Sequence, residues 1–209
     1  MAAYQPPVAL AILMVAASLA GHLWAEAAGR PLPRAVLKCT ASAGFLAVAA
    51  LGSLEGRYAR LVAAGLLLSA AGDALLLGKA RGAFLAGLAS FLLAHLAYAA
   101  AFAPAAAISP AAAVALAAAA AAIVRWLWPH LGDMRLPVVV YAAAISAMLL
   151  LALGVASPLV RWGALLFYLS DVAVARDRFV RPGFANRLVG LPLYYAGQVL
   201  LALSAGVPP

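Results

Sequence analysis

Long apolar runs, separated by short polar segments, extend along the whole chain. An α-helix needs about 17 to 25 such residues to cross a bilayer. Eight runs meet this requirement: residues 7–25, 36–52, 58–78, 84–103, 110–128, 137–154, 158–175 and 188–207. Turn-forming glycine and proline residues, as in Arg181-Pro182-Gly183, separate them. The pattern predicts an all-α, polytopic membrane bundle of eight transmembrane helices.

The short connections predict that consecutive helices are antiparallel neighbours and that residues 1–209 form a single integral membrane domain. Composition agrees, because 68% of the residues are hydrophobic and 10% are charged. Soluble domains have roughly 45–50% and about 25%. These values exclude a soluble globule and a disordered chain. Because Cys39 is the one cysteine, an internal disulfide and a cysteine-based metal cage are excluded too.

Basic residues concentrate in alternate connections and predict an orientation. Eleven of the 14 basic residues lie in or beside the first, third, fifth and seventh connections. They are Arg30, Arg34, Lys38, Lys79, Arg81, Arg125, Arg135, Arg176, Arg178, Arg181 and Arg187. By the positive-inside rule these connections are cytoplasmic, so both termini lie on the outer side of the inner cell membrane. The net charge of +8 therefore requires no nucleic-acid partner.

Two carboxylates, Asp73 and Asp171, lie inside predicted spans, whereas the other four acidic residues lie in connections or at span ends. A charged side chain within the bilayer costs about 2.5 kcal/mol or more, so such a residue indicates function. Asp73 precedes Lys79 by six residues and Asp171 precedes Arg176 by five. At 1.5 Å per residue both carboxyls lie about 8 to 9 Å below the cytoplasmic ends of their spans.

Polar residues of other spans are expected in the same layer. Lys38 and Ser42 open the second span, and Tyr141 lies at the corresponding level of the sixth. The eighth span places polar or small residues at four-residue spacing, and therefore on one helical face. These residues are Asn186, Gly190, Tyr194 and Gln198.

The fourth span carries an aromatic stripe instead: Phe84, Phe91, His95, Tyr98 and Phe102. His95 lies about 20 Å along this helix from Arg81, which is about 10 Å deeper than the aspartates. This count predicts no direct contact between His95 and either aspartate. His95 then either lines a pocket or is a buried histidine that is hydrogen-bonded between helices.

Residues 72–79 and 170–176 also resemble each other, since each pairs a small residue with an aspartate and ends on a basic residue. They fall on the third and seventh spans. This similarity suggests the hypothesis of two parallel four-helix repeats.

Three motifs together resemble the YhhN-type lysoplasmalogenase family of multi-pass membrane proteins. They are Ser69-x-x-Gly72-Asp73-x-x-Leu76-Leu77; Phe84-x-x-Gly87-x-x-x-Phe91-x-x-x-His95-x-x-Tyr98-x-x-x-Phe102; and Tyr168-x-Ser170-Asp171-x-x-x-Ala175-x-x-x-Phe179. The resemblance covers the whole chain in the number and order of spans. One departure concerns Lys38, which Cys39 follows here, whereas the family usually has proline after this lysine.

The resemblance implies hydrolysis of the vinyl ether bond of a lysoplasmalogen, which gives a fatty aldehyde and a glycerophospho-base. Such a reaction requires a carboxylic acid that protonates the β-carbon and a carboxylate that stabilises the cation or activates water. We therefore expect Asp73 and Asp171 to be the catalytic pair, with no metal and no cofactor. The lysophospholipid is expected to come from the inner leaflet. The expected substrate-binding residues are Lys38, His95, Tyr98, Tyr141, Asn186, Tyr194 and Gln198.

Two other classes of function are compatible with these residues. Membrane carboxylates also serve small-molecule and lipid transporters, and in a structural subunit they fix helices. Asp73 would then pair with Lys38, and Asp171 would be capped by Ser170 or an arginine. A serine or zinc hydrolase is disfavoured, because the chain has neither Gly-x-Ser-x-Gly nor His-Glu-x-x-His.

Overall fold

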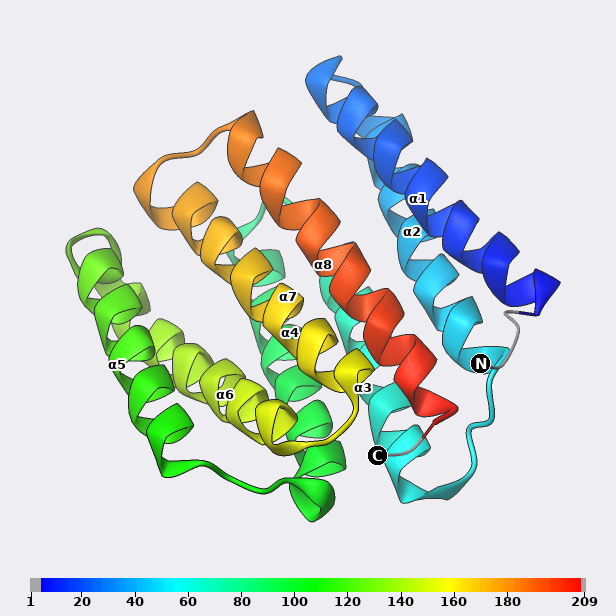
Figure 1. Cartoon of the computed structure of the whole chain (residues 1–209). Coiled ribbons are helices and arrows are strands. Elements are labelled where there is room, and N and C mark those ends of the chain that lie inside the picture. Colours follow the sequence, from blue (N-terminus) through cyan, green and yellow to red (C-terminus); the bar gives the residue numbers. More distant parts are fainter. Residues whose placement is uncertain (1–4, 208–209) are drawn as a thin grey trace.

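The computed structural model describes residues 5–207, and in this range the chain forms eight long helices (Figure 1). Each is long and apolar enough to cross a membrane. They are α1 (Pro6–Ala27), α2 (Pro31–Ala50), α3 (Gly56–Leu75), α4 (Arg81–Phe102), α5 (Pro110–Leu127), α6 (Arg135–Gly154), α7 (Pro158–Ala175) and α8 (Phe184–Ala205). Short 3-10 turns lie at Ala103–Ala105, Trp128–His130 and Gly132–Met134, and a π-helical turn, η4, covers Arg176–Val180. The predicted all-α polytopic fold is confirmed.

Helix starts and ends follow local chemistry. A proline occupies the first helical position of α2, α5 and α7, where a missing N–H costs no hydrogen bond. After α1, Gly29 has a φ of +63°, a conformation that glycine adopts without steric cost. The amide of Arg30 then donates to the carbonyl of Ala25 at 2.8 Å and closes a Schellman turn. This turn reverses the chain into α2.

Adjacent helices pack in antiparallel pairs around α8. The pairs α1–α2, α3–α4 and α7–α8 have the most extensive contacts, and α8 also contacts α1, α2 and α3. The helix α5 packs mainly on α6, and Leu127 is its one buried residue. The first turn of α1 and the last turn of α8 lie at the same end of the bundle (Figure 1). We call the opposite end, where α7 finishes and α8 begins, the basic end, because it carries the eleven basic residues of the odd connections.

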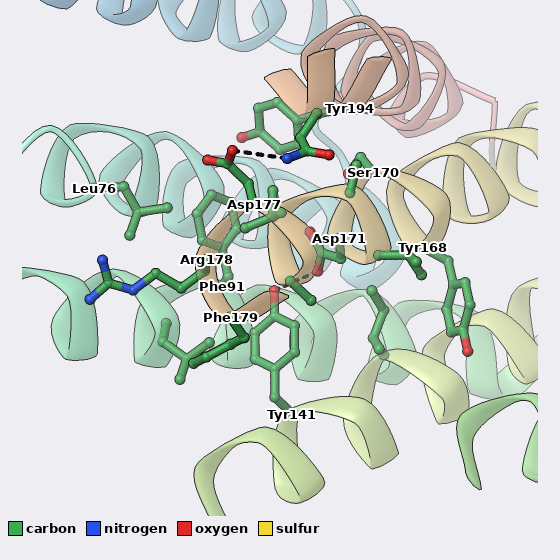
Figure 2. A pocket seen from close by; sticks show the side chains of 18 of the residues that line it. Leu76, Phe91, Tyr141, Tyr168, Ser170, Asp171, Asp177, Arg178, Phe179 and Tyr194 are labelled. Atoms are coloured by element: carbon green, nitrogen blue, oxygen red, sulfur yellow. Dashed lines mark hydrogen bonds between the residues drawn. The ribbon is translucent and has the colours of Figure 1, made fainter. Parts of the chain in front are cut away.

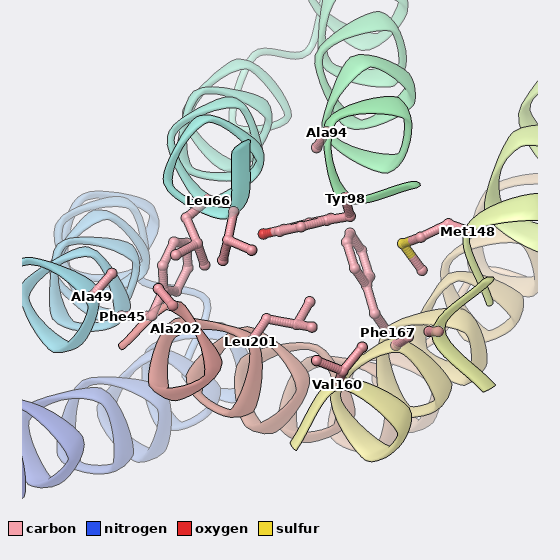
Figure 3. Close-up of a cluster of buried hydrophobic side chains, with 14 of the residues drawn as sticks. Phe45, Ala49, Leu66, Ala94, Tyr98, Met148, Val160, Phe167, Leu201 and Ala202 are labelled. Atoms are coloured by element: carbon pink, nitrogen blue, oxygen red, sulfur yellow. The ribbon is translucent and has the colours of Figure 1, made fainter. Parts of the chain in front are cut away.

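The apolar core lies between the central helices (Figure 3). Tyr98 of α4, Phe167 of α7 and Leu201 of α8 are all fully buried there. Glycines let these side chains enter: a Cβ at Gly65 would lie 2.5 Å from the Tyr98 ring. Gly65, Ser69 and Asp73 recur at four-residue spacing on α3, which places them on one helical face, and all three are buried.

Because α7 and α8 approach each other closely at Gly197, we expect one added methyl group at this position to lower the stability of the protein. A Cβ at Gly197 would lie 2.8 Å from the carbonyl oxygen of Gly163 and 3.1 Å from the amide of Phe167. Backbone atoms cannot rotate away, so we expect Gly197→Ala to lower the Tm in detergent by roughly 3–10 °C. Gly82→Ala is the control, because no neighbouring side chain or backbone atom of the described chain lies within 4 Å of its Cβ position. Equal Tm values for the two variants would contradict this packing.

Candidate active site

A cavity of about 180 Å³ lies at the basic end of the bundle (Figure 2). Residues of α2 to α8 and η4 line it, and most of the lining is apolar. Six of the predicted site residues are in the lining: Lys38, Asp73, Tyr141, Asp171, Asn186 and Tyr194. Both intramembrane aspartates therefore face one pocket, although they come from helices almost 100 residues apart in sequence.

Asp73 lies in a dense set of polar partners. Its side chain is 4% exposed, and its Oδ1 lies 3.1 Å from the Lys38 ammonium nitrogen. Its Oδ2 accepts hydrogen bonds from Ser42 at 2.7 Å and from Tyr194 at 2.8 Å. This Lys38–Asp73 ion pair is the one that the structural-subunit alternative requires, and Asp73 also faces the cavity. One buried cation and two hydroxyl donors are the environment of an ionised carboxylate.

Asp171 has a different environment. Its Oδ2 accepts a hydrogen bond from the Tyr141 hydroxyl at 2.6 Å, and its side chain is 17% exposed. Within residues 5–207, no lysine or arginine lies within ion-pair distance of it. Ser170 donates to the carbonyl of Phe167, and the hydroxyl that donates to Asp171 is that of Tyr141, whereas the structural-subunit alternative required a cap from Ser170 or an arginine. Asp171 is thus a membrane carboxyl that accepts a hydrogen bond from a neutral hydroxyl and has no lysine or arginine partner in the described chain.

His95 contacts Asp171, so the prediction that the two are separated in depth is wrong. The His95 Nε2 lies 3.7 Å from Asp171 Oδ2, beyond hydrogen-bond distance, and neither ring nitrogen has a hydrogen-bond partner among residues 5–207. The depth estimate from the sequence takes Arg176 as the cytoplasmic end of the seventh helix. In the structure, η4 continues the helical path to Val180, so Asp171 lies further from that end than the estimate gives.

The fully buried His95 ring is fixed by aromatic neighbours rather than by hydrogen bonds. It packs on Phe167 at a centroid distance of 4.6 Å and meets Tyr141 edge-on at 5.1 Å. It is not part of the cavity lining. His95 therefore lies behind the wall that carries Tyr141 and Asp171.

Tyr98 and Gln198 lie away from the cavity. The Tyr98 hydroxyl donates to Gln198 Oε1 at 2.8 Å, and the Gln198 amide donates to Ser69 at 3.3 Å. All three side chains are fully buried, and none belongs to the cavity lining. They connect α3, α4 and α8 in the core. Their position outside the cavity lining therefore does not support the prediction that Tyr98 and Gln198 contact substrate.

The turn between α7 and α8 and the first turn of α8 add cavity residues that the sequence did not indicate as site residues. These are Asp177, Arg178, Phe179 and Arg187. Asp177 accepts hydrogen bonds from the amide of Gly183 at 2.8 Å, from Asn186 at 3.1 Å and from Arg187 at 3.1 Å. The signal in the sequence is an acidic residue, Asp177, within a cluster of arginines that the positive-inside rule alone explains by membrane orientation.

Asn186 and Arg187 tie this turn to the rest of the bundle. Asn186 donates to the carbonyl of Arg181 at 2.7 Å and accepts from Arg176. Arg187 also pairs with Glu26 of α1, which in turn pairs with Arg34 of α2 at 3.0 Å. The turn at the mouth of the cavity is thus held by a charged network that reaches three other helices.

Known proteins give a consistent match to this chain. A model described as the YhhN family matches residues 33–205. Human lysoplasmalogenase TMEM86B is 39% identical over 177 residues, 82% of this chain and 74% of the human protein. The mouse protein of the same name is 36% identical over 200 residues, 94% of this chain and 85% of its own.

A bacterial relative is also named for the same activity. The lysoplasmalogenase of Mycobacterium bovis is 35% identical over 172 residues, which are 75% of this chain and 64% of the mycobacterial protein, less than two thirds of its length. No solved structure matches the chain. The family match covers both aspartate motifs and the aromatic stripe of α4. The chain belongs to the YhhN family of multi-pass membrane proteins.

Proposed function

We propose that this protein hydrolyses the vinyl ether bond of lysoplasmalogens and releases a fatty aldehyde and a glycerophospho-base. The observation that carries the proposal is the pair of aspartates on one cavity with opposite surroundings. Relatives named lysoplasmalogenase support it. The names of these relatives denote a hydrolase and do not support the alternative of a transporter.

Asp171 is the proposed acid. Without a lysine or arginine beside it, the neutral carboxylic acid is the form that a low-dielectric pocket favours. Its proton is transferred to the β-carbon of the vinyl ether, which leaves an oxocarbenium ion at the α-carbon. Water then adds to the α-carbon and returns a proton to the Asp171 carboxylate. The hemiacetal collapses to the aldehyde and the free glycerol hydroxyl, so protons balance over the cycle.

Asp73 is the proposed anionic partner. Lys38, Ser42 and Tyr194 hold its carboxylate in one orientation at the cavity wall. A fixed negative charge stabilises the oxocarbenium ion more than the neutral substrate, which is the condition for acceleration. Tyr194 also lines the cavity, so it links this carboxylate to the space where substrate would lie.

The depth of the cavity fits this substrate class. The vinyl ether of a lysophospholipid lies just below the headgroup, and the cavity that both aspartates face lies at the basic end of the bundle. We propose that this end faces the cytoplasm, that the protein lies in the inner cell membrane, and that substrate enters from the inner leaflet.

Release of aldehyde from a 1-alkenyl lysophospholipid by the purified protein in detergent tests the function. We expect release from this lipid and none from 1-acyl or 1-alkyl lysophospholipids, because only the vinyl ether has a carbon that an acid can protonate to an oxocarbenium ion. A well-folded protein that releases no aldehyde would contradict the proposal.

A further inference from the structure

Arg178 is a cavity-lining cation whose charge is not neutralised within the part of the chain that the structure describes. The other two basic residues of the lining are paired: Lys38 with Asp73, and Arg187 with Asp177 and Glu26. The Arg178 side chain is exposed, and no acidic residue of the described chain lies within ion-pair distance of it.

An aromatic ring orients this guanidinium. Its central carbon lies 4.1 Å from the centroid of the Phe84 ring, and Phe84 lines the same cavity. Phe84 in turn meets Phe179 edge-on at 6.3 Å. A guanidinium stacked on a ring is held in place while its N–H groups stay available to a ligand.

Arg178 and Asp171 lie on one face of the same helical path. They are separated by seven residues, close to two turns, which is about 10 Å along the axis. In Figure 2, Asp171 lies between Arg178 and Tyr168, so these three side chains follow one another along the pocket.

We propose that Arg178 binds the phosphate of the lysophospholipid substrate and thereby places the vinyl ether at Asp171; this inference rests on the proposed function. Seven covalent bonds join the β-carbon of the vinyl ether to the phosphorus atom, about 9 Å when extended. That length is close to the rise of about 10 Å along the helix axis between the backbone positions of Asp171 and Arg178. A guanidinium suits the task, because its planar N–H groups bind phosphate oxygens in pairs.

Two substrates, with and without phosphate, test this role. For Arg178→Gln we expect KM for a 1-alkenyl lysophospholipid to rise about tenfold or more, with kcat within about twofold. Values for 1-alkenylglycerol, which lacks the phosphate, are expected to stay unchanged. Arg178→Lys should give an intermediate KM, because it keeps the charge without the paired hydrogen bonds.

Arg135→Gln is the matched control. Arg135 is also an exposed arginine over an aromatic ring, 4.7 Å from the Trp128 centroid, and it does not line the cavity. Its KM for both substrates should equal that of the unaltered protein. An Arg178→Gln variant that loses activity on both substrates alike, or on neither, would overturn the proposal. A variant that keeps its activity on both substrates is the result expected if Arg178 contacts only bulk phospholipid headgroups.

Calorimetric binding of a short-chain 1-O-alkyl lysophospholipid, which has no vinyl ether to cleave, separates this inference from the proposed function. Binding that Arg178→Gln weakens about tenfold supports the phosphate site, even if the unaltered protein releases no aldehyde. Equal binding by both proteins, or none by the unaltered protein, overturns the phosphate site, whether or not aldehyde is released.

Discussion

An Asp171→Asn variant is expected to lose about 10³-fold in kcat for aldehyde release, with KM changed little. An amide has nearly the shape of a carboxyl but cannot give up its proton to carbon, and general acid catalysis contributes about 10²- to 10⁴-fold. The Tyr141 hydroxyl can still donate to the amide oxygen, so the surroundings persist. The measurement is aldehyde release at saturating 1-alkenyl lysophospholipid.

The same variant should fold as well as the unaltered protein. Within the described chain Asp171 has no lysine or arginine partner, so the amide leaves no charge uncompensated. Asp133→Asn serves as a control, because Asp133 is an exposed carboxylate outside the cavity that pairs with Arg81. A folded Asp171→Asn variant with more than about a tenth of normal kcat would exclude Asp171 as the acid.

The spans were predictable because the bilayer imposes one length on every helix. All eight were placed to within a few residues, and the largest differences are at starts: α2 begins at Pro31 rather than residue 36, and α8 at Phe184 rather than residue 188. Where the first turn of a helix contains polar residues, a prediction from apolar runs places the start of the helix too late. In α8 this turn contains Asn186 and Arg187, whose partners come from η4 and α1.

Part of the site was predictable for a related reason. A carboxylate within a span requires a partner, and four-residue spacing placed Tyr194 on the buried face of α8. Contacts between spans were not predictable in detail, since helical periodicity fixes a face and not its neighbour. The Tyr98–Gln198 hydrogen bond joins residues 100 positions apart. The π-helical turn η4, which follows the helix of Asp171, has no signature in the amino-acid composition, so the His95–Asp171 contact was not predicted.

Membrane orientation and the hypothesis of two four-helix repeats both stay predictions. The orientation depends on the uneven distribution of arginine and lysine, and it is independent of the helix packing. The repeat hypothesis depends on one short similarity between residues 72–79 and 170–176. The aspartates of these segments have unlike partners, Lys38 for one and Tyr141 for the other. A duplication would therefore have been followed by divergence of the two sites.

Asp73→Asn is expected to reduce both stability and activity, for separate reasons. The substitution leaves the Lys38 ammonium, 11% exposed, without its anion. Breaking a buried pair in this way costs about 3–5 kcal/mol of the free energy of unfolding. Loss of the fixed charge near the oxocarbenium ion should lower kcat about 10²- to 10³-fold. Tm in detergent and aldehyde release measure the two effects.

The double variant Lys38→Met/Asp73→Asn separates a catalytic carboxylate from an ion pair that only fixes the bundle. Methionine fills the lysine site without a charge, and replacing both members of a buried pair is often neutral or stabilising. Stability should therefore return close to that of the unaltered protein, while aldehyde release stays low. Recovery of release together with stability would show that Asp73 fixes α3 to α2 and takes no part in the reaction, and Asp171 would then act alone.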